Sequence, residues 1–101
     1  MHKTIILLSR QPTKSHEEFI SWWLESHAPL ARQLPRLRKA VFNVVDQPGD
    51  GQPDGVSELW FDSVNDFVAA YDSEIGKAVV ADSLANVASR QRFFVEETEI
   101  L

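Results

Sequence analysis

His27 is the residue of this sequence best suited to acid–base chemistry. A histidine titrates near neutral pH and can therefore give or take a proton under physiological conditions. It falls on the apolar stripe of a predicted helix, four residues after Trp23 and two before Pro29. Because a proline has no N–H to donate, it leaves a backbone carbonyl free in the preceding turn. From the residues alone, a core histidine that hydrogen-bonds this carbonyl is the simpler interpretation.

Other residue types that carry chemistry are poorly placed for a site. The chain has no cysteine, which excludes disulfides, thiolate metal ligands and a cysteine nucleophile. His2 and His16 are expected at the surface, and no two histidines stand at metal-ligand spacing, so we predict no metal and no other cofactor. Glu58 could act as a proton-transfer partner, but a solvated carboxylate is the simpler interpretation. No glycine-rich phosphate loop and no Ser-His-Asp arrangement is expected.

Size and composition limit the chain to one small domain. It has 101 residues, of which 44% are hydrophobic, and we expect a single domain over residues 1–101. The net charge is −5, with no interleaving of basic and aromatic residues, which argues against nucleic-acid binding. The apolar run Ile5–Leu8 is too short for a signal peptide or a membrane span, so a cytoplasmic protein is expected. A basic cluster is expected to form a solvated rim or to hold an anionic substrate or an acidic face of another subunit: Arg32, Arg36, Arg38 and Lys39.

Four strands and two helical regions are predicted, in the order β-α-β-β-α-β. The strand segments are rich in β-branched and aromatic residues and are separated by turn formers. They are Lys3–Arg10, Ala40–Val45, Val56–Phe61 and Gln91–Glu97. Residues 46–55 are nearly all turn formers and predict a long, flexible connection. This order is typical of an α+β, ferredoxin-like fold with a four-stranded antiparallel sheet and both helices on one face.

The first helix is expected to start at a capping box and to stop early. Ser15 followed by Glu18 has the sequence of such a box. Pro29 removes a backbone hydrogen bond and disfavours helical geometry in the residue before it. We therefore expect the regular helix to end near His27, with a separate turn over residues 30–34.

The second helical region is expected in two parts. Ser63 caps a helix whose buried face carries Val64, Phe67, Val68 and Tyr71. A break at Asp72-Ser73 then leads into a looser helical stretch that carries Ile75, Val79, Leu84 and Val87.

Both faces of the predicted sheet are apolar, which predicts a homodimer. In the first strand Ile5 and Leu7 alternate with Ile6 and Leu8, and the other strands show the same double pattern. Two helices cover only one face of a four-stranded sheet, and a large uncovered apolar face is rare on a monomer. A second copy packed sheet on sheet through a two-fold contact would bury it.

The run from Phe19 to Arg38 resembles the EthD family of dimeric α/β-barrel proteins. The similarity lies in His27-Ala-Pro-Leu30 followed by Leu34-Pro-Arg-Leu37, with further matches at Asp54–Phe61 and Ala81-Asp82. It extends over essentially the whole chain. The resemblance implies a dimer formed through the sheets and a pocket between sheet and helices.

The resemblance also implies a site, which this sequence matches only at His27. Members include the EthD protein of alkyl ether degradation, which accompanies a cytochrome P450 system, as well as methylmuconolactone methylisomerases and polyketide-tailoring enzymes. The methylisomerase pocket combines the histidine with a tyrosine and a cysteine, and their positions here are Ala40 and Leu59. Methylisomerase activity is therefore not expected. Trp23, Phe42 and Leu59 are predicted to line a pocket for an apolar organic molecule, with His27 as the catalytic candidate.

Two functions remain open at this point. One is a small catabolic enzyme, such as an isomerase or dehydratase, or an accessory to an oxidoreductase, that acts on a xenobiotic or aromatic compound. The other is a non-catalytic carrier or scaffolding dimer. A monooxygenase of the same architecture is a weaker third interpretation, since only His27 could ligate a haem. The sequence does not name the ligand or the reaction.

Overall fold

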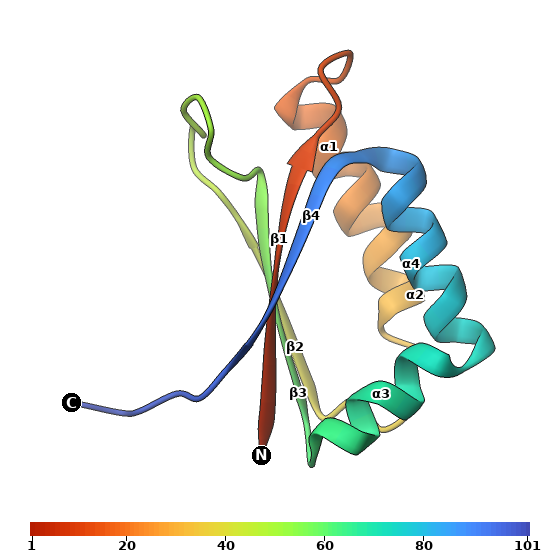
Figure 1. Ribbon diagram of the computed structural model, residues 1–101. Helices are drawn as coiled ribbons and strands as arrows, with labels where there is room; N and C mark the ends of the chain where they lie inside the picture. The colour runs from red at the N-terminus through yellow and green to blue at the C-terminus, as the bar shows by residue number, and fades with distance from the viewer.

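Four antiparallel strands form one sheet in the computed structural model, which describes residues 1–101. Across the sheet the order is β2-β3-β1-β4, with bounds β1 (His2–Arg10), β2 (Lys39–Val44), β3 (Gly55–Phe61) and β4 (Val87–Val95). The helical segments all lie on one face (Figure 1). They are α1 (His16–Trp22), the π-helical turn η1 (Trp23–His27), α2 (Ala28–Ala31), α3 (Val64–Asp72) and α4 (Glu74–Asn86). This confirms the predicted α+β, ferredoxin-like fold.

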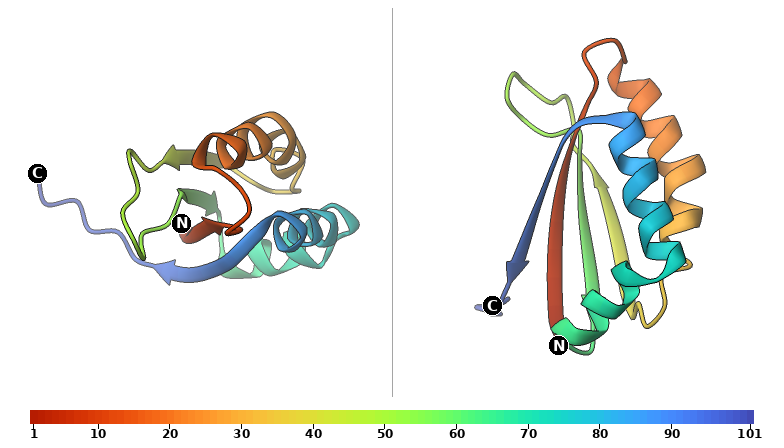
Figure 2. Two further views of the ribbon diagram at one scale, coloured as in Figure 1. Left: turned by 90° about the horizontal axis from the view of Figure 1, so that it is seen from above. Right: turned by 45° about the vertical axis from the view of Figure 1, so that its right-hand side comes forward.

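The core lies between the sheet and the helices. Along β3 every second residue from Gly55 to Phe61 is buried, and on β1 the buried positions are Thr4, Ile6 and Leu8. Side chains alternate across a strand, so these residues share the helix-covered face. In Figure 2 the first helix and α4 lie side by side over this face. Their contact decides which side chains meet at the functional site.

The first helix begins as predicted but does not end as predicted. Ser15 and Glu18 form the capping box. The chain then stays helical through Pro29, and Ala28 keeps helical φ and ψ of −59° and −45°. Within η1 the Ala28 N–H bonds to the carbonyl of Trp23, five residues back. This wider turn makes room for the proline ring, so the expected end at His27 is wrong.

The second helical region has the predicted break but a different buried face. Ser63 and Ser73 cap the starts of α3 and α4. Phe67 and Ala70 face the core, whereas Val64 and Val68 are exposed, because a helix this short presents only a narrow stripe to the sheet. The stretch predicted to be loose is a regular helix of 13 residues, on which Leu84 is exposed.

The last strand starts earlier than predicted. The chain passes directly from α4 into β4 at Val87, rather than at Gln91. The reason is that β1 is long enough to offer backbone partners to the whole segment, with Arg10 opposite Val87 and Leu8 opposite Arg90. Arg90 therefore belongs to the sheet, and on the helix-covered side, because its partner Leu8 faces that side.

The opposite face of the sheet carries apolar side chains that no helix covers. They are Ile5, Leu7, Val41, Val56, Trp60, Phe93 and Val95, and all are at least partly accessible. Polar residues are interspersed: Lys3 pairs with Glu58 at 2.8 Å and contacts the Trp60 ring. No helix of the chain has the length and apolarity that crossing a bilayer requires.

Candidate active site

His27 ends the π-helical turn and is buried where that helix meets α4. Its Nδ1 lies 2.8 Å from a carboxylate oxygen of Asp82, and its Nε2 lies 3.4 Å from the Ser83 hydroxyl oxygen. Both partners are on α4, 55 and 56 residues further along the chain. The packing of two helices, rather than any local motif, assembles this group.

The Asp82 carboxylate determines which nitrogen of His27 carries the proton. A carboxylate only accepts hydrogen bonds, so the neutral imidazole donates from Nδ1 and keeps an acceptor lone pair on Nε2. Burial lowers the pKa of His27, the hydrogen bond and charge of Asp82 raise it, and Arg90 lowers it again. The net pKa lies below its ordinary value. At neutral pH the imidazole is therefore uncharged and its Nε2 can take up a proton.

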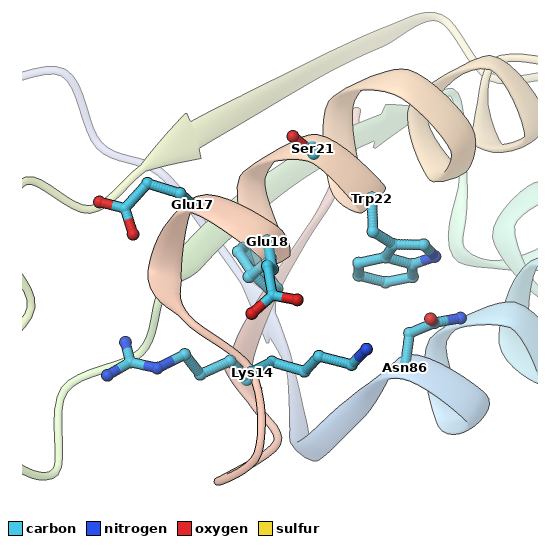
Figure 3. Close-up of a pocket in the computed structure, with 8 residues that line it drawn as sticks. Lys14, Glu17, Glu18, Ser21, Trp22 and Asn86 are labelled. Carbon is cyan, nitrogen blue, oxygen red and sulfur yellow. The ribbon is translucent and has the colours of Figure 1, made fainter.

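Asp82 is held in place by two further side chains. The Trp22 indole nitrogen lies 3.4 Å from its Oδ1, and the Asn86 amide donates to its backbone carbonyl at 2.8 Å. The Trp22 ring also packs over His27, with ring centroids 4.9 Å apart. Trp22 and Asn86 also line a polar hollow of about 380 Å³, and Figure 3 shows both of them near Lys14. Trp22 therefore stands between His27 and this solvent-facing hollow.

A small cavity between sheet and helices adjoins His27 and Ser83. About 10 Å³ of it is free, roughly the room needed by one water molecule. Apolar side chains of β1, β2 and β3 make much of the lining, and the polar members are His27, Ser57, Tyr71, Ser83 and Arg90. A drug-sized ligand occupies a few hundred Å³, so an organic molecule fits only if lining side chains move.

The structure brings together three of the four predicted site residues. His27, Phe42 and Leu59 line the cavity, whereas Trp23 does not. Trp23 is fully buried and stacks on the Phe42 ring, with centroids 4.5 Å apart and planes inclined by 11°. On its other side Phe42, together with Ala31, lines an open groove of about 560 Å³. The Phe42 ring is thus a wall shared by the closed cavity and the groove.

Sequence reasoning gave no role to Asp82, although Ala81-Asp82 was one of the matches that carried the family resemblance. Nothing local marks this aspartate, because its partner is 55 residues away. The available signal was a match of Asp82 and His27 to one family pattern, which could have prompted a search for a histidine–carboxylate pair.

Contrary to expectation, a serine, a histidine and an aspartate form a hydrogen-bonded row at the site. Ser83, His27 and Asp82 are linked by the two contacts described above. Acyl transfer also needs donors for an oxyanion, commonly free backbone N–H groups. Ser83 sits inside an unbroken helix, whose backbone amides are engaged in helical hydrogen bonds. The group is therefore better suited to moving a proton than to nucleophilic attack.

The remaining ionisable candidates lie outside the cavity. Glu58 is on the helix-free face and pairs with Lys3. His16 is not at the open surface as predicted, because its ring lies 2.8 Å from the buried Asp54, which also binds Arg10. Nor is His2 fully exposed: it contacts Thr4 and packs edge-on against Phe94. No three His, Asp or Glu side chains are grouped to hold a metal ion.

Comparisons with known proteins identify the family. The family model of the EthD domain matches residues 11–91. An EthD-family protein from Bacillus halodurans C-125 has a solved structure that superimposes with a TM-score of 0.80, at 25% identity, over 97% of this chain and 100% of that one. A comparison with curated protein sequences found no significant match.

Two more distant structures show the fold alone. A dimeric ferredoxin-like protein from Thermobifida fusca YX gives a TM-score of 0.75 at 18% identity, over 93% of this chain and 88% of that one. SnoaB, a cofactor-independent oxygenase from Streptomyces nogalater, gives a TM-score of 0.70 at 12% identity, over 99% of this chain and 95% of that one. Because the family model spans both halves of the fold and includes His27 and Asp82, this chain belongs to the EthD family.

Proposed function

We propose that this chain, as one EthD domain, is an enzyme that binds a small apolar carbonyl compound and moves a proton on it with His27. The observation that carries the proposal is the buried His27–Asp82 pair beside the cavity. The carboxylate fixes the tautomer, burial keeps the imidazole neutral, and Nε2 is left as the acceptor. General base catalysis requires this combination of geometry and protonation state.

Access of a ligand to His27 would run through Phe42. The ring separates the closed cavity from the open groove, and rotation of this one side chain would join the two spaces. The body of the ligand would then lie in the groove, whose lining is mostly apolar, with its reacting end beside His27. SnoaB is described as a cofactor-independent oxygenase, so a protein of this fold can act without a cofactor.

Exchange of hydrogen for deuterium beside a carbonyl group tests the proposal without knowledge of the natural substrate. A panel of cyclic ketones and lactones is incubated with the protein in D₂O, and loss of the α-hydrogen signal is followed by NMR. We expect exchange above the buffer rate for at least one compound, and a loss of about 100-fold or more in His27→Asn, the usual scale for removal of a general base.

His16→Asn is the matched control, because His16 also contacts a carboxylate but lies outside the cavity. It should exchange at the wild-type rate. A His27→Asn protein that exchanges as fast as the wild type would contradict the proposal. So would a wild-type protein that accelerates exchange of no compound in the panel.

A non-catalytic carrier or scaffolding protein, including one that serves an oxidoreductase, is the second candidate. Ala40 and Leu59 favour it, because they stand where the methylisomerase resemblance implies a tyrosine and a cysteine. A carrier would bind members of the same panel, seen as quenching of tryptophan fluorescence, without exchanging their hydrogens. Binding that survives in His27→Asn would support this candidate.

The helix-free face is proposed as the interface of a homodimer. Its seven apolar side chains are uncovered, and a second copy packed sheet on sheet would bury them. Solved proteins of the same fold from Thermobifida fusca and Bacteroides fragilis are described as dimeric. Light scattering should therefore give twice the mass of the 11.5 kDa chain.

A further inference from the structure

Arg90 is a half-buried cation without an acidic partner, and it lines the same cavity as His27. No carboxylate forms an ion pair with it. By contrast, Arg10, Arg36 and Arg38 each pair with an aspartate, and Arg92 packs on two phenyl rings. Burial of a charge is costly unless something compensates it. An unpaired guanidinium at a cavity therefore points to a ligand that carries or develops negative charge there.

Tyr71, the only tyrosine of the chain, lines this cavity as well. Its ring packs against Phe67, with centroids 4.7 Å apart. Burial raises the pKa of the Tyr71 phenol, and the nearby Arg90 guanidinium opposes this rise. The hydroxyl is therefore protonated at neutral pH and available as a hydrogen-bond donor.

We infer that Tyr71 and Arg90 form an oxyanion-binding pair that stabilises an enolate while His27 holds the transferred proton. The inference rests on the proposed function and deepens it by naming the residues that bind the carbonyl oxygen of the substrate, a compound with a removable hydrogen on the carbon next to the carbonyl. A neutral phenol and a guanidinium are donors of the kind that stabilise such an oxygen. The apolar part of the lining suits the carbon body of the same molecule.

The step balances without any co-reactant. His27 Nε2 takes the proton from the α-carbon, and the electron pair of the broken C–H bond forms a double bond to the carbonyl carbon. The carbonyl π pair moves to oxygen, which becomes the enolate oxygen and receives the Tyr71 and Arg90 hydrogen bonds. In a substrate with a β,γ double bond the enolate is conjugated with it, and return of the proton from His27 to the γ-carbon gives an isomer. Return to the α-carbon in D₂O gives the exchange described above.

The inference is tested with 4-nitrophenol, whose phenolate has the planar shape and oxygen charge of an enolate and absorbs visible light only when ionised. We expect the wild type to bind the anion, so that the visible band grows when protein is added at a pH where the free phenol is largely protonated. Arg90→Leu should weaken binding of the anion by about 10- to 100-fold and Tyr71→Phe by about 10-fold, as expected for lost hydrogen bonds to a charged oxygen.

Arg92→Leu is the matched control, because it removes the same charge from the same strand but does not line the cavity. It should bind the anion like the wild type. The inference is overturned if Arg92→Leu weakens binding as much as Arg90→Leu, if the bound phenol stays neutral, or if the wild type does not bind it. Loss of binding only on Arg32→Leu would place the anion in the groove and would also overturn it.

The two proposals can fail separately. If Tyr71→Phe and Arg90→Leu retain both deuterium exchange and phenolate binding while His27→Asn loses exchange, the proton-transfer function stands and the oxyanion pair is wrong. If phenolate binding depends on Tyr71 and Arg90 but no carbonyl compound exchanges, the anion site stands and the enzyme proposal is wrong. Melting temperatures of all variants identify any that fail to fold.

Discussion

Replacement of Gly55 by alanine is expected to displace the Trp23 indole from its place behind Phe42. Gly55 opens β3 and is buried under this indole. A Cβ atom at residue 55 would lie 2.6 Å from both Cζ3 and Cη2 of Trp23, and 3.0 Å from Cζ of Phe19. The backbone of Gly55 is not left-handed, so the effect of the substitution is steric alone.

The size of the effect follows from these distances. Carbon atoms pack best at about 3.5–4.0 Å, so the indole has to move by about 1 Å. Trp23 is fully buried and stacks on Phe42, and a close-packed core passes such a shift on to its neighbours. Overpacking of this kind costs about 1–3 kcal/mol. We expect Gly55→Ala to lower the free energy of unfolding by that amount.

A double-mutant cycle tests the cause as well as the cost. Trp23→Phe removes the two indole carbons that meet the new Cβ, and it also removes a buried N–H that has no hydrogen-bond partner. The double variant should therefore be more stable than the sum of the single effects predicts, by about 1 kcal/mol or more. Urea unfolding followed by far-UV circular dichroism measures this, at one protein concentration because a dimer's stability depends on it.

Gly49→Ala is the control, since its Cβ would meet only Gln52, at 3.6 Å. It should leave stability unchanged within about 0.5 kcal/mol. Wild-type stability in Gly55→Ala would show that Trp23 moves freely, and strictly additive effects in the double variant would show that the two residues do not press on each other. Either result would refute the packing argument.

Three further predictions concern charge and assembly. Burial lowers the pKa of His27, so the unfolded chain takes up a proton below about pH 6.5 that the folded chain resists, and wild-type stability should fall there. Over the same pH range the urea midpoint of His27→Asn should fall less than that of the wild type. Asp54→Asn should cost about 2 kcal/mol in urea unfolding at pH 7, because the carboxylate binds Arg10 and His16. Burial raises the pKa of Asp54, but these hydrogen bonds outweigh it and the net pKa is lowered, so the cost should shrink below about pH 4; a constant cost would contradict this. Ile5→Lys should reduce the mass in light scattering to that of one chain, and an unchanged mass would argue against the helix-free face as the interface.

The strands and helix starts were predictable because their signals are local. The capping box at Ser15 and the serine cap at Ser63 act within one turn, and the alternation of side chains acts within one strand. The end of the first helix was not predictable in this way. Pro29 is compatible with a helix once the turn before it widens, and only tertiary packing selects that wide turn. The early start of β4 likewise depends on partners that β1 supplies from a distant part of the chain.

The site shows the same division between local signals and contacts that only the fold creates. The stripe position of His27 and the resemblance pointed to this residue, and the pocket predicted with the resemblance included Phe42 and Leu59, which lie beside it. The places of Asp82 and Arg90 at the site follow only from the packing of α4 against the first helix and of β4 against β1. In the sequence, Tyr71 was interpreted only as part of the buried face of its helix. In the structure it brings a phenol to the cavity from α3, although Ala40 provides none from β2.

The π-helical turn also sets the angular phase of the first helix. Its buried residues Phe19, Trp23, His27 and Ala31 recur every four positions. In a regular α-helix each such step overshoots a full turn by about 40°, so three steps would carry Ala31 about 120° away from the direction of Phe19. One wide turn takes up an additional residue and recovers about 100° of this. Deletion of Glu25 would remove that correction, and the segment after it would then turn a different face to the sheet.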